Sequence, residues 1–143
     1  MAMLTLEKAR IIVAETLKAG VTKGFKPLTV AVLDSGGALI ALERSDGSSR
    51  MRPDIAIGKA NGAIGLGMGS RALHKRAEEQ AYFIQAMNAL AKGVLVPVPG
   101  GVLVRGEGGA ILGAVGVTGD TSDNDEAAAI AGIKAAGFAA DGG

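Results

Sequence analysis

Two glycine-containing turns, each joining short runs of β-branched residues, constrain most strongly what this chain can fold into. The run Leu28–Leu33 is followed by the turn Asp34–Gly37 and a second run, Ala38–Glu43. Strands joined by so short a turn pair antiparallel. In the second half, the turn Glu107–Gly109 precedes another apolar run, Ala110–Val117. The sequence therefore predicts an antiparallel sheet.

Helical patterns account for much of the remaining chain. Thr5 can cap a helix over Leu6–Lys18, where apolar residues recur at helical spacing. Pro53 suits the first turn of a helix over Pro53–Asn61. Ser70 can begin one helix that continues to Gly93, and Thr121 or Ser122 can cap a last helix.

Two valine-rich runs precede the turn at Glu107. Val94–Val98 and Val102–Val104 flank Pro99-Gly100-Gly101, which predicts a strand pair or one bent strand. The predicted order is therefore α-β-β-α-α-β-β-α. Helices that flank an antiparallel sheet define an α+β fold, and the length suits a single domain over residues 1–143.

Composition and charge exclude several classes of protein. Lys plus Arg number 15 and Asp plus Glu 14, and the aromatic residues are three Phe, one Tyr and no Trp. We therefore expect no nucleic-acid partner, because both a positive field and stacking platforms are lacking. No run approaches the roughly 20 apolar residues of a membrane span, and the start lacks a secretory pattern. We expect a protein without a membrane partner, located in the cytoplasm.

Charged residues around the start of the second helix form the main candidate site. Arg44 and Arg52 bound a polar loop, and Asp54 and Lys59 lie in the helix that follows. We expect these side chains to face the turn Gly100–Gly101 and to bind a small carboxylate, because Arg offers paired donors and glycine leaves backbone N–H groups open. In the alternative interpretation, Asp54 caps its helix or pairs with Arg52, and Lys59 extends along the surface.

Other titratable residues suggest weaker sites. If the protein is an enzyme, Asp54, Lys59 and Glu107 are the side chains expected to transfer protons. The only histidine, His74, lies among Arg and Lys residues, which favours a solvated helix face over a metal ligand. The acidic residues over 120–126 are interpreted as helix capping, so no metal site is expected.

Five segments carry a resemblance to a known family. They are Val30–Gly37, Leu42–Gly47, Asp54–Ala60, Pro97–Val102 and Gly113–Gly119. Their order and spacing resemble those of the GlcG/HbpS family of haem-binding or haem-degrading-type proteins, which includes the C-terminal domain of PduO-type proteins.

The resemblance implies a profilin-like sheet with helices on both sides and assembly into a homo-oligomer. It also implies, for some members, haem bound at or near a subunit surface, and for others a role with small metabolites in catabolism. In the PduO-type domain it would place a histidine ligand in the first helix. Leu6–Lys18 contains no histidine, so His74 and Tyr82 are the candidate ligands in this chain.

Two functions follow as hypotheses. The first is a small-ligand-binding protein whose ligand is haem or a related tetrapyrrole, with Arg44, Arg52, Gly100 and Gly101 available for a haem propionate. The second is an enzyme that acts on a small carboxylate metabolite by proton transfer or hydrolysis.

Overall fold

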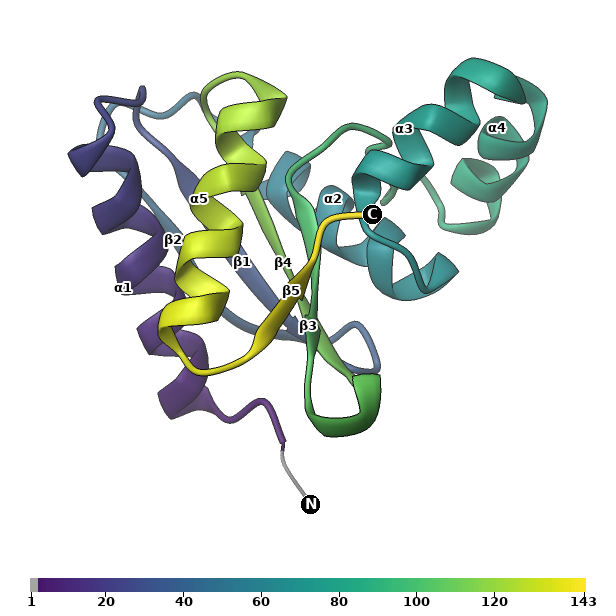
Figure 1. Cartoon of the computed structure of the whole chain (residues 1–143). Coiled ribbons are helices and arrows are strands. Elements are labelled where there is room, and N and C mark those ends of the chain that lie inside the picture. The colour runs from purple at the N-terminus through teal and green to yellow at the C-terminus, as the bar shows by residue number, and fades with distance from the viewer. Residues whose placement is uncertain (1–2) are drawn as a thin grey trace.

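The computed structural model describes residues 3–143, and in that range it confirms the α+β fold with one antiparallel sheet (Figure 1). In chain order the elements are α1 Leu6–Thr22, β1 Thr29–Asp34, β2 Leu39–Arg44, α2 Arg52–Leu66, α3 Ser70–Glu79, α4 Ala81–Leu90, β3 Gly101–Arg105, the short 3-10 helix η1 Glu107–Gly109, β4 Ile111–Thr118, α5 Ser122–Ala135 and β5 Ala139–Asp141. None of the helices within this range combines the length and the apolar character that a bilayer crossing requires.

The strand order β2-β1-β4-β3-β5 unites both halves of the chain in one sheet. In β1, which lies between β2 and β4, Val30 lies opposite Glu43 of β2 and opposite Val117 of β4. Because β1 and β4 run antiparallel, Asp34 at the end of β1 lies opposite Gly113 near the start of β4. The β1–β2 and β3–β4 turns therefore meet at the same end of the sheet.

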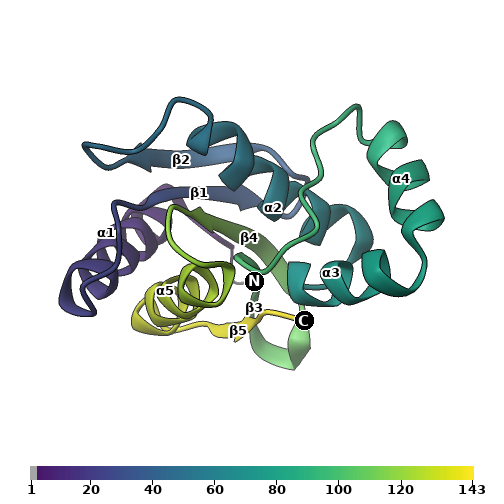
Figure 2. The same ribbon diagram turned by 90° about the horizontal axis from the view of Figure 1, so that it is seen from above.

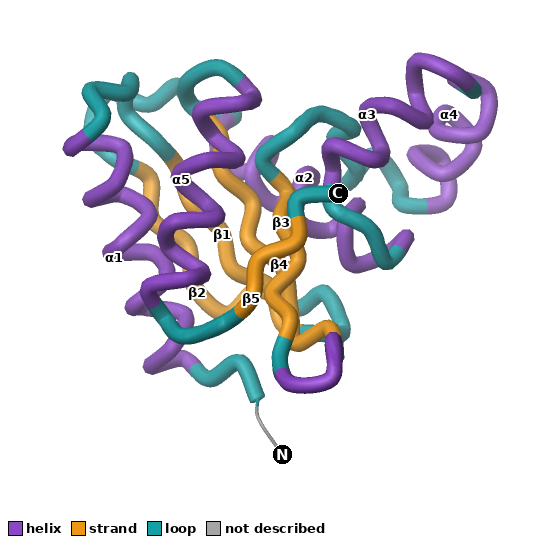
Figure 3. The backbone as a smooth tube through the Cα atoms, viewed as in Figure 1, coloured by secondary structure: helices purple, strands orange, loops and turns teal. Residues whose placement is uncertain are grey.

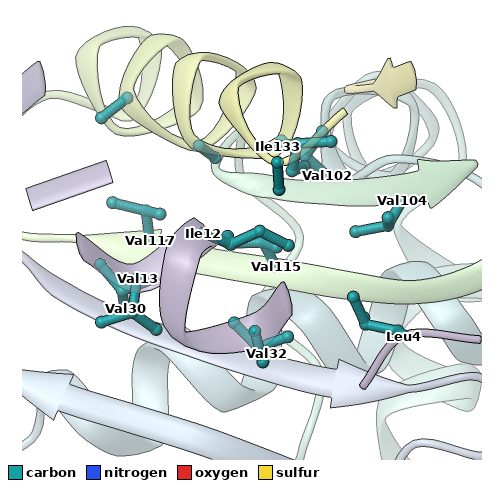
Figure 4. Close-up of a cluster of buried hydrophobic side chains, with 14 of the residues drawn as sticks. Leu4, Ile12, Val13, Val30, Val32, Val102, Val104, Val115, Val117 and Ile133 are labelled. Carbon is teal, nitrogen blue, oxygen red and sulfur yellow. The ribbon is translucent and has the colours of Figure 1, made fainter. Parts of the chain in front are cut away.

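Helices cover both faces of this sheet. Helices α1 and α5 pack on one face and α2 packs on the other, as the view from above shows (Figure 2). Alternate residues of the strands point to opposite faces. On the α1–α5 face this alternation builds a core of valines with Leu4, Ile12 and Ile133 (Figure 4).

The opposite face carries small residues, which lets α2 lie very close to the sheet. A Cβ atom added at Gly116 of β4 would lie 1.8 Å from the carbonyl oxygen of Ala56 in α2. Ala60 and Ala63 of α2 are also buried there, together with Ala114 of β4. This close approach brings the middle of α2 directly against the sheet.

The helix predicted over Ser70–Gly93 is instead two helices. It breaks at Gln80, whose backbone adopts φ −141° and ψ 63°, and α4 then packs back on α3. The Arg76 guanidinium lies 4.2 Å from the centre of the Phe83 ring across this break. The break lets Leu73 of α3 and Ile84 of α4 share one apolar cluster, and both helices project beyond the sheet (Figure 1).

The sheet differs from the prediction at two segments: a predicted strand is absent, and a strand that was not predicted is present. Val94–Val98 is a loop (Figure 3), because the Val96 N–H donates to the carbonyl of Gly58 in α2 rather than to a strand. The alanine-rich segment Ala139–Asp141 forms an edge strand, β5, that pairs with β3. In addition, α2 is longer than predicted and continues to Leu66.

Candidate functional site

Lys59 lies at the centre of the region predicted as the main site. Helix α2 begins just before Pro53, and its sheet-facing side carries Lys59 into the interior, where the side chain is only 2% exposed. Its Nζ donates to the backbone carbonyl of Val117 at 2.9 Å and to Oδ2 of Asp125 at 3.1 Å. The ammonium group is therefore held between β4 and α5.

Asp125 completes a buried ion pair with Lys59. It lies in the first turn of α5, and its other oxygen, Oδ1, accepts from the Asp120 N–H at 2.9 Å. Burial lowers the pKa of Lys59, because desolvation disfavours the ammonium form; the Asp125 carboxylate opposes this shift and Arg52 adds to it. The pair thus joins α2, β4 and α5 at one point.

The Gly100–Gly101 backbone packs directly on Lys59, as predicted. Gly100 has a φ of 123°, and a Cβ atom there would lie 2.8 Å from Lys59 Nζ. The Gly101 N–H donates to Ser70 Oγ at 2.6 Å, and the Gly100 carbonyl accepts from the Val117 N–H at 2.9 Å. The Gly101 N–H and the Gly100 carbonyl are therefore both hydrogen-bonded to other groups of the protein.

Arg52 lies at the edge of the same region. Its Nη1 donates to Oγ1 of Thr118 at 2.8 Å and its Nε donates to Ser49 Oγ at 3.1 Å. The structure thus brings Arg52, Lys59, Gly100 and Gly101 together. None of three cavities found within residues 3–143 has any of these four in its lining, because the Lys59 side chain itself fills the space.

The two other residues of the predicted pocket, Arg44 and Asp54, lie outside this cluster, as does Glu107, the third candidate for proton transfer. Arg44 is exposed and its Nη1 donates to the carbonyl of Ser48 at 3.2 Å. Asp54 is exposed at the start of α2, and Glu107 is exposed in the β3–β4 turn. The roles predicted for these three residues in binding or catalysis stay predictions.

Sequence reasoning missed Asp125, which is the partner of Lys59. Its position in the first turn of a helix suggested only an interaction with the helix dipole. The other acidic side chains nearby have partners of their own: Asp123 and Glu126 bind Arg71. A buried lysine needs a buried carboxylate as its partner. The segment over 120–126 has four acidic residues, and only the fold shows that Asp125 is the buried one.

His74 and Tyr82 lie on the projecting helices, α3 and α4 respectively. The His74 side chain is 45% exposed, and its Nδ1 lies 3.8 Å from Oε1 of Glu78. Tyr82 is 71% exposed. Both side chains are accessible to a ligand that approaches this surface.

Asp120 orders the loop that leads into α5. Its carboxylate accepts from the backbone N–H of Lys26 at 2.7 Å, from the Thr121 N–H and from the side chain of Asn124. These bonds, with that of Lys26 as the largest contribution, lower the pKa of Asp120 to about 2.

This lowered pKa predicts a pH-dependent contribution to stability. Since the folded state holds the Asp120 proton more weakly than the unfolded state, the contribution is present above the ordinary value of 3.8 and is lost as the pH falls toward about 2. In urea denaturation between pH 5 and pH 2, the wild type should therefore lose more stability than Asp120→Asn. Parallel curves for the two proteins would contradict the assignment.

Known proteins resemble this chain over most of its length. Residues 4–134 match the model of a protein family described as "Haem degrading protein HbpS-like". A double mutant of HbpS from Streptomyces reticuli is 29% identical, with a TM-score of 0.78 over 94% of this chain and 87% of that chain. No curated protein sequence matches significantly.

Two further solved structures share the fold at lower identity. The complex of PduOC with haem is 17% identical, with a TM-score of 0.85 over 96% of this chain and 97% of that chain. The protein ORFY of Klebsiella pneumoniae is 22% identical, with a TM-score of 0.83 over 95% of this chain and 92% of that chain.

Proposed function

Since the chain belongs to the HbpS-like family, we propose that it is a small-ligand-binding protein whose ligand is haem or a related tetrapyrrole. Its relatives include HbpS, at 29% identity, and the fold is that of a protein solved in complex with haem. The assembly into a homo-oligomer and the cytoplasmic location stay predictions from the sequence.

The observation that carries the proposal is the half-exposed imidazole of His74 on a projecting helix. Haem iron is held in proteins by His, Tyr, Met or Cys, and the sequence has one His, one Tyr, five Met and no Cys. His74 and Tyr82 are both accessible at the surface, and Lys75, next to His74, is an exposed cation suited to a propionate. These residues fit a haem bound at the surface of α3 and α4.

An enclosed site within one chain fits less well. His74 and Tyr82 line none of the three cavities found in the described part of the chain. The largest of these, of about 640 Å³, has Asp34 and Glu107 as its only charged lining residues, which disfavours the negative propionates. We therefore place the haem on the surface of the projecting helices.

The second hypothesis, an enzyme acting on a small carboxylate, has less support in the geometry. Its proposed groups are dispersed: Lys59 is buried and paired, Asp54 is exposed at the start of the same helix, and Glu107 is exposed in the β3–β4 turn. A substrate carboxylate would have to displace Asp125 to reach Lys59. The arrangement therefore favours ligand binding over proton transfer at this lysine.

A hemin titration tests the proposed function. The wild type should develop a Soret band that saturates at a fixed ratio of hemin to chain. Loss of the imidazole in His74→Ala should weaken binding by more than about tenfold and change the band, because iron then loses its strongest available ligand. Tyr82→Phe tests the phenolate as a second ligand in the same way.

Gln85→Ala provides a matched control, since Gln85 is exposed on α4 and its side chain is not expected to bind iron. It should titrate like the wild type. Identical spectra and affinities for the wild type, His74→Ala and Tyr82→Phe would overturn the proposal, as would a titration that never saturates.

A further inference from the structure

The largest of the three cavities described above lies where the two hairpin turns meet. Its volume is about 640 Å³, within the range of about 300–1,000 Å³ that small-molecule sites occupy. It is lined by the β1–β2 turn, by the β3–β4 turn and by the segment just before α1. The antiparallel pairing of β1 with β4 brings these two turns together.

Apolar side chains form one part of the cavity wall. Leu4, Ile111 and Leu112 all line it. Leu4 is buried because it lies over Gly113 of β4, where a Cβ atom would come within 2.6 Å of Leu4 Cδ2. The lack of a side chain at Gly113 therefore positions this wall.

The charged groups of the lining are both acidic. They are Asp34 and Glu107, and no Lys, Arg or His belongs to the lining. Oδ1 of Asp34 accepts from the N–H groups of Gly36 and Ala38, at 3.0 and 2.9 Å. Its Oδ2 and the whole Glu107 carboxylate have no hydrogen bond or ion pair among residues 3–143.

The β3–β4 hairpin contains one basic residue, Arg105, and its guanidinium is bound to other groups. Arg105, at the end of β3, donates to Asp141 of β5 at 2.9 Å and to the carbonyl of Gly109 at 2.7 Å. The two carboxylates therefore face a partly apolar cavity without a cationic partner from this hairpin. Charge complementarity favours a cation there and disfavours an anion.

We propose that this cavity binds a small organic cation. Its ammonium or amidinium group is held by Asp34 and Glu107, and its apolar body packs on Leu4, Ile111 and Leu112. Hydrogen bonds between a charged donor and a carboxylate are about twice as strong as neutral ones. The site is separate from the surface proposed for haem and stands independently of it.

Three probes of nearly equal shape and different charge test this inference. Benzylamine, benzyl alcohol and benzoate are each titrated into the ¹⁵N-labelled full chain and followed by amide chemical shifts. Benzylamine should shift the amides over 34–38 and 106–112 with an affinity at least about tenfold higher than that of benzyl alcohol. Benzoate should cause no saturating shifts there.

Substitutions at the cavity separate its charge from its shape. Glu107→Gln should weaken benzylamine binding by about tenfold and leave benzyl alcohol unchanged. Asp34→Asn, which retains an oxygen acceptor for the turn, should act in the same direction. Ala110→Phe, which fills the mouth at an exposed lining residue, should block both probes.

Glu79→Gln is the matched control, because Glu79 is an exposed carboxylate at the end of α3. It should bind benzylamine like the wild type. Equal affinity for the three probes would overturn the proposal, as would unchanged benzylamine binding in Glu107→Gln. Absence of shifts at both turns, or the same loss in Glu79→Gln, would overturn it too.

Discussion

Lys59→Met is expected to lower the free energy of unfolding by about 3–5 kcal/mol, because it leaves a buried carboxylate without its partner. Asp125 is only 2% exposed, and in the native protein it accepts from Lys59 Nζ at 3.1 Å. Methionine retains most of the apolar volume of the lysine stem, so the loss reports the charge rather than a cavity. Urea denaturation at pH 7 with linear extrapolation measures the difference.

A double-mutant cycle isolates the pair. Asp125→Asn should also destabilise the protein, since it leaves the Lys59 ammonium buried without a counter-charge. The double variant should be more stable than the sum of the two losses predicts, by about 1–3 kcal/mol. Strictly additive losses would show that the two groups do not interact.

Asp123→Asn provides the exposed control for this cycle. Asp123 is 79% exposed and pairs with Arg71, which is 43% exposed. Exposed ion pairs contribute about 0–1 kcal/mol, so this variant should lie close to the wild type. A loss as large as that of Lys59→Met would mean that burial does not govern these pairs.

The same lysine also predicts an alkaline pH dependence. Because burial lowers the pKa of Lys59 in the folded state, the unfolded state binds more protons between that lowered value and the ordinary 10.5. The stability of the wild type relative to Lys59→Met should therefore rise with pH across this window. A flat difference would indicate an unperturbed lysine.

The fold could be predicted from the sequence to the extent that local signals determined it. The turn Asp34–Gly37 identified the β1–β2 hairpin, and the cap at Thr5 identified the start of α1; both were confirmed. The strand predicted over Val94–Val98 was wrong because strand propensity does not say what a segment packs against. In this fold, Val96 bonds to α2 and lies outside the sheet.

The candidate site was predictable only in part, for a related reason. The association of Lys59 with Gly100 followed from placing both halves of the chain in one sheet, and the structure has that contact. The burial of Lys59 did not follow, because it depends on how closely α2 approaches β4. That approach depends on the absence of a side chain at Gly116. The sequence alone does not indicate this, because it does not say which helix packs on that residue.

Gly116→Ala is therefore expected to have one of the largest effects of any single substitution. The new Cβ would lie 1.8 Å from the Ala56 carbonyl oxygen, 2.8 Å from the Ala56 carbonyl carbon and 3.1 Å from the Ala60 nitrogen. All three are backbone atoms, so no side-chain rotation relieves the clash. Overpacking typically costs about 1–3 kcal/mol and occasionally more; with α2 forced away from the sheet, we expect about 3 kcal/mol or more.

Gly65→Ala is the matched control, since it makes the same chemical change within α2. Nothing lies within 4 Å of a Cβ at Gly65, and replacing a helical glycine with alanine stabilises by about 0.5–1 kcal/mol. Urea denaturation should therefore move the two variants in opposite directions. If Gly116→Ala were as stable as the wild type and retained the buried Lys59–Asp125 pair, α2 could not lie as close to β4 as this fold requires.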